Sequence, residues 1–306
     1  MRKKKGFTLV ELLVVIAIIA LLMGILMPAL ARVRQIAFRM TCGTNLSGIG
    51  KAMLIYANDY EDELPRAGGT NTALGGTVRW DAIDRFLAYG LNNQGQGGNA
   101  TISSSFYLLV KYAEVTPKSF VCKGDSGTSE FKLADYPNRD PACVELINAW
   151  DFGGDPKKHC SYAYHLPYGL YALTTASEPG MAVAADRNPW ISTAGADFKQ
   201  PFTNFRPDIP PHNGSTDAAR FGNAITHQED GQNVLFMDSH VEFEKRSYCG
   251  LENDNIYTLA VANQPREIGT VPIFGQPPLD RKDNVVVHDG TYAGGGGGGG
   301  TTPRTR

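Results

Sequence analysis

The amino-acid sequence predicts an α+β protein in which one long N-terminal helix packs on an antiparallel β-sheet. Two observations carry this prediction: an uncharged apolar run at positions 12–31, and a strand pattern with a two-residue period at positions 233–244.

The chain has 306 residues, of which 42% are hydrophobic and 20% charged, as is ordinary for a folded protein. This composition argues against collagen, wholesale disorder and a membrane protein with several spans. The net charge of −2 gives no reason to expect a nucleic-acid partner.

The apolar run has the length of a membrane span, since about 20 helical residues at roughly 1.5 Å each reach about 30 Å. Glu11 lies at its start, where a carboxylate at bilayer depth costs on the order of 3 kcal/mol and calls for a partner or a function. A cut after Gly6 would free an amino group at Phe7, which could neutralise Glu11 on a neighbouring helix. Two alternatives stay open: Glu11 reaches back to the interface, or the run is a secretory signal cleaved among the small residues at 27–31.

Residues 5–13, Lys-Gly-Phe-Thr-Leu-Val-Glu-Leu-Leu, resemble the class III signal of type IV prepilins and type II secretion pseudopilins. The resemblance implies a pilin-like fold and a membrane prepilin peptidase that cuts after Gly6 and methylates Phe7. It also implies that Glu11 aligns the subunit during assembly with other pilin or pseudopilin subunits. Pro28 lies where many of these proteins carry a helix-loosening proline. The basic cluster at positions 2–5 should stay cytoplasmic, so we expect a single-pass inner-membrane protein whose globular part lies in the periplasm or at the cell surface.

Beyond Pro28 the apolar residues keep helical spacing, which predicts one helix over 7–58, with a bend allowed and with its outer half packed on the globular part. Gly43, Gly48 and Gly50 each weaken this helix by up to about 1 kcal/mol relative to alanine. Two successive apolar stripes are expected: Leu30, Val33, Ala37 and Met40, then Cys42, Leu46, Ile49, Met53, Tyr56 and Tyr60.

The remainder predicts a short helix near 80–89 and strands at 118–122, 160–165, 169–174 and 181–186. The clearest signal is a hairpin formed by 233–237 and 240–244. A two-residue turn would pair Phe236 with Val241 and Val234 with Phe243, with all four on one face and Glu242 on the other. The hairpin resembles the C-terminal pattern of a large prepilin-like family, with Ser239 at a position where glycine is usual. Its residues are His227, Gly231, Asn233, Asp238, His240 and Val241.

Metal binding is a second possibility for the hairpin region. His227, Asp238 and His240 could converge on a transition metal, and the acidic segment 252–255 could hold calcium, although the spacing of an EF-hand loop is absent. Otherwise no cofactor is expected. The alternative reading of the three residues is that they fix the loop by hydrogen bonds.

Five cysteines in an exported chain indicate disulfide bonds rather than a zinc site, because no two have Cys-x-x-Cys spacing. Their pairing stays open; they are Cys42, Cys122, Cys143, Cys160 and Cys249. Residues 122–127 resemble the nucleophile segment of chymotrypsin-like proteases, but the first histidine, His159, follows Ser126, so the chain order fails. A turn anchored by a disulfide at Cys122 is the better interpretation.

The expected organisation is a leader at 1–6, a transmembrane assembly helix at 7–31, an amphipathic outer helix at 32–62, a β-rich globular domain at 63–290 and a glycine-rich tail at 291–306. The function that follows is a structural subunit of a type IV pilus or a type II secretion pseudopilus, not an enzyme. The alternative is a membrane-anchored module whose globular part binds a ligand or a metal. The sequence does not distinguish a major from a minor subunit.

Overall fold

The computed structural model describes residues 8–192, 199, 201–273 and 275–292. The predicted leader, Gly6, Phe7 and residues 293–306 of the predicted tail therefore lie outside the described residues. Two further residues of the predicted tail, Thr291 and Tyr292, form a short strand.

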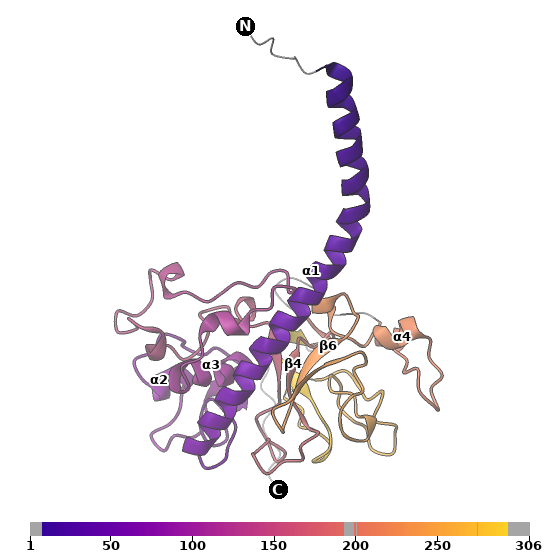
Figure 1. Cartoon of the computed structure of the whole chain (residues 1–306). Coiled ribbons are helices and arrows are strands. Elements are labelled where there is room, and N and C mark those ends of the chain that lie inside the picture. The colour runs from indigo at the N-terminus through magenta and orange to yellow at the C-terminus, as the bar shows by residue number, and fades with distance from the viewer. Residues whose placement is uncertain (1–7, 193–198, 200, 274, 293–306) are drawn as a thin grey trace.

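The first helix, α1 (Leu9–Asp59), is continuous across the predicted membrane and outer segments. Figure 1 shows it leaving the globular part as a free arm, with a change of direction before it crosses the body. The second predicted stripe is confirmed from Cys42 to Tyr56, all buried, whereas Tyr60 is exposed. The first stripe does not pack on the body, because Leu30, Val33 and Met40 are 60–70% exposed.

The predicted α+β architecture is confirmed by an antiparallel five-stranded sheet in the order β7-β6-β4-β3-β8. Its strands are β3 (Tyr162–His165), β4 (Ala182–Asp186), β6 (Gln232–Phe236), β7 (Val241–Glu244) and β8 (Val286–Val287). Two small pairs complete the strands: β1 (Ala73–Leu74) with β2 (Asn99–Ala100), and β5 (Ile191–Ser192) with β9 (Thr291–Tyr292).

The hairpin is where predicted, but its register is shifted by one residue. Leu235 pairs with Val241 and Asn233 with Phe243, and the turn holds three residues, 237–239, instead of two. Because side chains alternate along a strand, this shift changes which β6 residues share a face with Val241 and Phe243: Asn233 and Leu235 do so, and Val234 and Phe236 lie on the opposite face. Leu235 therefore faces α1, and Val234 faces a second core on the other side of the sheet. The prediction that Val234, Phe236, Val241 and Phe243 share one face was wrong.

The other helices are α2 (Arg85–Tyr89), α3 (Ile102–Tyr112) and α4 (Thr216–Arg220). The short helix expected near 80–89 corresponds to α2. The strands predicted at 160–165 and 181–186 correspond to β3 and β4. The strand predicted at 118–122 was wrong: Pro117 starts a 3₁₀ helix there, Pro117–Phe120. Segment 169–174 forms turns and contributes only an isolated bridge between Thr174 and Glu63. Further 3₁₀ turns are Leu133–Asp135, Leu146–Asn148, Pro156–Lys158, Phe202–Asn204, Ile225–His227 and Leu251–Asn253.

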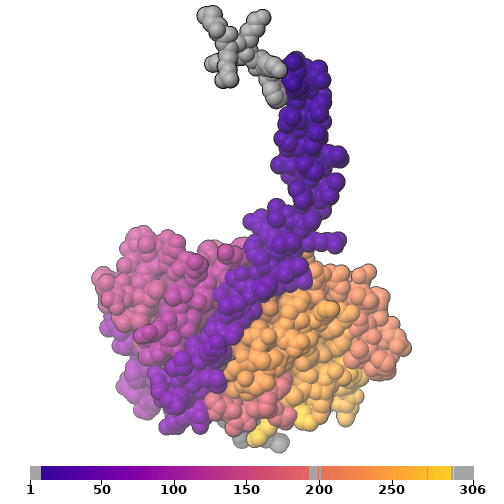
Figure 2. Space-filling model, viewed as in Figure 1, coloured from indigo at the N-terminus to yellow at the C-terminus, as the bar shows by residue number. Residues whose placement is uncertain are grey.

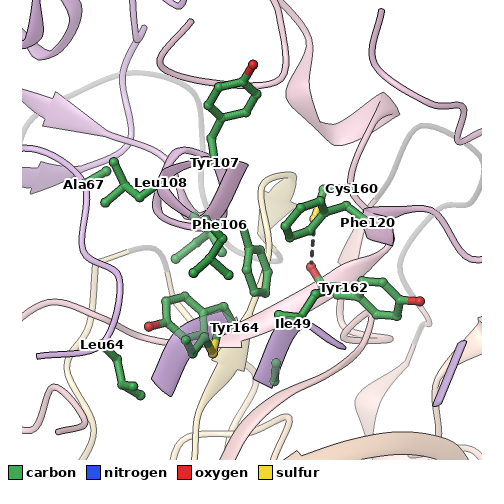
Figure 3. Packing of buried hydrophobic residues seen from close by; sticks show 14 of the residues in the cluster. Ile49, Leu64, Ala67, Phe106, Tyr107, Leu108, Phe120, Cys160, Tyr162 and Tyr164 are labelled. Carbon is green, nitrogen blue, oxygen red and sulfur yellow. Dashed lines mark hydrogen bonds between the residues drawn. The ribbon is translucent and has the colours of Figure 1, made fainter. Parts of the chain in front are cut away.

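The main core fills the space between α1, α3 and one face of the sheet. In Figure 3, Ile49 of α1, Phe106 of α3 and Tyr164 of β3 belong to one cluster, and the rings of Phe106 and Tyr164 have centroids 5.0 Å apart. Two glycines set the distance between helix and sheet, because a Cβ on Gly50 would lie 2.7 Å from Leu235 Cδ1 and one on Gly43 would lie 3.1 Å from Asn233 Oδ1. The second core, on the opposite face, surrounds Trp190 and includes Val234. The central strands are thus buried on both faces.

Candidate functional site

The free arm of α1 is the most distinctive surface of the molecule. Every residue from 8 to 34 is exposed, and the large apolar side chains between Leu9 and Val33 are 45–77% exposed. Figure 2 shows this arm standing clear of the body, while the rest of α1 lies across it. Within the described residues, α1 is the one helix long and apolar enough to cross a membrane. The arm therefore has the properties of a single-pass membrane anchor.

Glu11 closes a capping box at the start of α1. The Thr8 backbone N–H donates to Glu11 Oε2 over 2.8 Å, the Thr8 hydroxyl donates to the same oxygen over 2.7 Å, and the Glu11 N–H donates back to Thr8 Oγ1 over 3.3 Å. A capping box satisfies backbone donors that a helix start leaves free. Glu11 thus has partners within its own chain, a local role that sequence reasoning missed although Thr8 and Glu11 have the spacing of a capping box.

Pro28 lies inside α1 and does not end it. A proline there has no N–H to donate to the carbonyl of Gly24 one turn earlier, which loosens the helix within the exposed arm. A Cβ on Gly24 would have no heavy atom within 4 Å. This part of the arm therefore makes no contact that would oppose bending.

A disulfide fastens the packed half of α1 to the body. Cys42 on α1 bonds Cys122, which follows the 3₁₀ helix Pro117–Phe120, and both are fully buried. The expectation that Cys122 anchors a turn through a disulfide is confirmed.

In the same segment Asp125 forms a buried ion pair of 3.3 Å with Arg187, whose guanidinium also donates to the carbonyl of Cys160. Among the described residues the cysteines left free are Cys143, Cys160 and Cys249.

The structure does not bring His227 together with Asp238 and His240. His227 is buried before the start of β6, where its Nε2 lies 3.3 Å from Asn233 Nδ2. Asp238 and His240 are exposed at the hairpin tip, where they bond each other. The length of β6, roughly 3.4 Å per residue, separates the two places. A shared metal ion at these three residues is incompatible with that separation.

The acidic segment considered for calcium already has its own cations. Lys282 pairs with Glu252, and Arg266 pairs with Asp280 and approaches Asp254 to 3.8 Å. Burial, reinforced by the nearby Asp283 carboxylate, raises the pKa of Asp254 to about 8. Burial thus disfavours the ionised carboxylate that calcium binds, and a guanidinium already lies beside it.

A buried polar cluster was missed by sequence reasoning. Asp186, at the end of β4, accepts hydrogen bonds at Oδ2 from the Asn233 N–H over 2.7 Å and from Asn233 Nδ2 over 3.2 Å. The same oxygen lies 3.3 Å from His227 Nε2, and His227 Nε2 lies 3.9 Å from Cys122 Sγ. These residues are far apart along the chain, so no local spacing could have identified the cluster. The sequence offered two partial signals: an aspartate that ends a predicted buried strand, and His227 and Asn233 in the hairpin pattern.

Comparisons with known proteins bear on the start of the chain. A family model described as the prokaryotic N-terminal methylation motif matches residues 1–27. Neither the curated proteins nor the solved structures give a match to the chain. The match covers the predicted leader, the predicted cut after Gly6, Glu11 and most of the exposed arm. The chain therefore carries a prepilin-type N-terminal methylation motif on a long apolar helix, followed by an antiparallel α+β body.

Proposed function

We propose that this protein is a prepilin-like structural subunit, cut after Gly6, methylated at Phe7 and assembled through α1 into a type IV pilus or a type II secretion pseudopilus. The observation that carries the proposal is the methylation motif at residues 1–27 together with an arm whose described residues, 8–34, are all exposed. A prepilin peptidase, the membrane and other subunits of the same kind are the partners that this function requires.

The shape of the arm supports assembly. An apolar helix exposed on all sides needs a surrounding that buries it. Before assembly, lipid can do so over a span of this length. In a filament, the arms of neighbouring subunits would take the place of lipid, while the body, joined to the same helix by the buried face from Cys42 to Ala57, would lie outside.

Glu11 has two roles in this proposal. Its bonds to Thr8 reduce the cost of a carboxylate in lipid, because the oxygen keeps two donors inside the bilayer. The amine of a processed Phe7 on an adjoining subunit would add a charged partner that the isolated chain lacks. The carboxylate therefore favours the assembled state over the single subunit.

The position of the body follows from charge and redox chemistry. The basic residues at 2–5 favour a cytoplasmic leader, which directs the body to the other side of the membrane. The Cys42–Cys122 disulfide is consistent with an oxidising compartment. The periplasm or the cell surface meets both conditions.

Mass spectrometry of the protein isolated from cells with active prepilin peptidase tests processing. The expected mature mass lacks residues 1–6 and carries one additional methyl group. A Gly6→Val variant is the control and should keep its leader. A wild-type chain that begins at Met1, or that is trimmed near residue 31, contradicts the proposal.

Replacing Glu11 by valine tests assembly separately from anchoring. We expect the variant to remain in the membrane with a folded body and to be lost from sheared surface fibres or from cross-linked subunit ladders. Glu11→Gln, which keeps the size and can still bond Thr8, should assemble less than the wild type and more than Glu11→Val. Unchanged assembly of Glu11→Val would favour the alternative, a membrane-anchored binding module.

The pockets give this alternative little support. One described pocket, bordered by Glu63, Arg66 and His165, has a volume of about 160 Å³. Ligand sites for small organic molecules are typically about 300–1,000 Å³. A second pocket, beside the Asp125–Arg187 ion pair, is smaller still, at about 50 Å³.

A further inference from the structure

Four metal-binding side chains meet at one buried point between α1 and the sheet. Cys42 comes from α1, Cys122 from the segment after the 3₁₀ helix Pro117–Phe120, Asp186 from the end of β4 and His227 from the 3₁₀ helix Ile225–His227. All four side chains are fully buried, and their sulfur, oxygen and nitrogen atoms lie within 4.8 Å of one another. In the structure the two cysteines are joined as a disulfide.

The spacing of these atoms fits tetrahedral coordination. Bonds of about 2.0–2.3 Å at tetrahedral angles place neighbouring ligand atoms roughly 3.3–3.8 Å apart. His227 Nε2 lies 3.3 Å from Asp186 Oδ2 and 3.9 Å from Cys122 Sγ. All four atoms lie within 4.8 Å of one another, so separation of the bonded sulfurs together with shifts of about 1 Å would let them surround one ion.

The disulfide alone does not account for its neighbours. Within the described part of the chain, Asp186 Oδ1 and His227 Nδ1 are buried without a hydrogen-bond partner. Burying a carboxylate and an imidazole beside an apolar S–S bond is costly unless each is fully paired. A cation at the centre of the cluster would neutralise this carboxylate through Oδ2, the oxygen that lies 3.3 Å from His227 Nε2, rather than through the unpartnered Oδ1.

Asn233 holds the carboxylate ligand, Asp186, in place. Its backbone N–H and its side-chain amide both donate to Asp186 Oδ2. The amide also lies 3.3 Å from His227 Nε2 in the disulfide form, a contact that is lost when the one lone pair of this nitrogen binds the ion. Such outer contacts orient ligands in metal sites. Asn233 is therefore a positioning residue for the cluster.

We propose that the reduced form of this protein binds one divalent cation of the zinc class through Cys42, Cys122, Asp186 and His227, and that formation of the Cys42–Cys122 disulfide releases it. Two thiolates, an imidazole and a carboxylate suit zinc better than magnesium or calcium. The proposal goes beyond the structural role of the subunit, since it gives the body a metal-bound state that exists only before oxidation.

The chemistry balances with a disulfide oxidant as co-reactant. When the cation binds, each of the two thiols loses one proton and forms one metal–sulfur bond. On oxidation, the thiolate sulfurs lose two electrons in total and join to each other. The oxidant RSSR takes these electrons and two protons to give two RSH, and the divalent cation leaves.

The test uses the full chain in detergent, reduced with a phosphine and titrated with Co²⁺ and then with Zn²⁺. We expect intense tetrahedral cobalt–thiolate absorption, its loss on addition of zinc, and one zinc per chain by elemental analysis. Asp186→Asn and His227→Gln should each weaken binding by at least about 10–100-fold. His165→Gln is the matched control, because His165 is equally buried but lies outside the cluster, and it should leave binding unchanged.

Three results would overturn the proposal. The first is that the reduced wild type shows no cobalt–thiolate absorption. The second is that a Cys42→Ser/Cys122→Ser variant binds zinc as well as the wild type does. The third is that the Asp186 and His227 variants bind zinc like the wild type. If the cysteine variant does not fold by circular dichroism, the reoxidation rate of wild-type Cys42 and Cys122, followed by peptide mass mapping, decides instead. Zinc should slow this rate and a chelator should restore it, and a rate independent of zinc contradicts the site.

Discussion

At the residue scale, Ser239 occupies a backbone conformation that does not suit it. It is the third residue of the β6–β7 turn and has φ of +72°, in the left-handed region. A side chain costs roughly 1–2 kcal/mol there, whereas glycine adopts this region freely. After the larger chain entropy of glycine is subtracted, we expect Ser239→Gly to stabilise the protein by about 0.5–1 kcal/mol. Urea unfolding in detergent measures this as a higher midpoint with an unchanged slope.

Two further variants at the same position check that explanation. The urea midpoint of Ser239→Asn should lie between those of the wild type and Ser239→Gly, since asparagine tolerates the left-handed region. Ser239→Val should lower the midpoint, because a β-branched side chain tolerates it least. The reverse order of midpoints would show that turn strain does not limit stability here.

Asp151 is a buried acid whose ionisation opposes folding. Burial, together with the nearby Asp289 carboxylate, raises the pKa of Asp151 to about 7, although the Thr101 hydroxyl donates to it. The unfolded carboxyl ionises near pH 4, so between about pH 4 and 7 the folded state binds the additional proton. The stability that this group contributes is complete below pH 4 and is lost as the pH rises through 7.

The Asp151→Asn variant tests this sign. Because the amide stays neutral, the free energy of unfolding of the variant should match that of the wild type near pH 4. At pH 8 it should exceed the wild-type value by on the order of 3–4 kcal/mol at most. Urea midpoints measured from pH 4 to 8 give the difference, and the exposed Asp59→Asn serves as control. A constant difference at every pH would mean that Asp151 does not hold a proton in the folded state.

At the scale of elements, the contact between α1 and β6 depends on a missing side chain. Leu235 is 1% exposed and approaches Gly50 so closely that a Cβ would lie 2.7 Å from its Cδ1. Because the buried leucine has little room to move, we expect Gly50→Ala to destabilise the protein by about 1–2 kcal/mol in spite of the better helix propensity of alanine.

Gly48 on the same helix is the matched control. A Cβ there has no heavy atom within 4 Å, so Gly48→Ala should stabilise the protein by up to about 1 kcal/mol. If urea unfolding shows that Gly50→Ala lowers stability and Gly48→Ala raises it, the close approach of helix and strand is supported. Stabilisation by both would show that Leu235 moves aside freely.

Sequence periodicity predicted the elements that have one consistent pattern. The 3.6-residue stripe from Cys42 to Tyr56 identified the buried face of α1, and the hydrophobic runs identified β3, β4 and the hairpin. The hairpin register could not be predicted, because β6 is buried on both faces and alternation no longer selects one of them. Helix α3 was also missed. Its serines, Ser103, Ser104 and Ser105, are buried together with its apolar residues, so burial in this helix does not follow polarity.

The candidate sites divide in the same way. The motif around Gly6 and Glu11 is local in sequence, and residues 1–27 alone identified it. The buried cluster of Cys42, Asp186 and His227 joins one helix, one strand and one 3₁₀ turn. The sequence analysis named Cys42 and His227 as candidates but did not place them beside Asp186, because only the tertiary fold brings such separated residues together.

At the scale of the whole molecule, the protein consists of an arm and a body that are energetically separate. No residue from 8 to 34 is buried, whereas the first fully buried residue of α1, Cys42, is also joined to the body by the disulfide. We therefore expect a chain that begins at residue 32 to remain folded in buffer without detergent. Its disulfide should form, and its urea midpoint should lie close to that of the full chain in detergent.

A chain that begins at residue 46 is the control that locates the boundary. It loses Cys42, and with it a disulfide between residues 80 positions apart, which contributes about 4.5 kcal/mol by the chain-entropy argument. It also loses the ion pair between Arg39 and Asp230, which joins the helix to the loop before β6. If the chain from residue 32 unfolded as readily as the chain from residue 46, the arm would have to stabilise the body, and a subunit whose arm serves assembly alone would be ruled out.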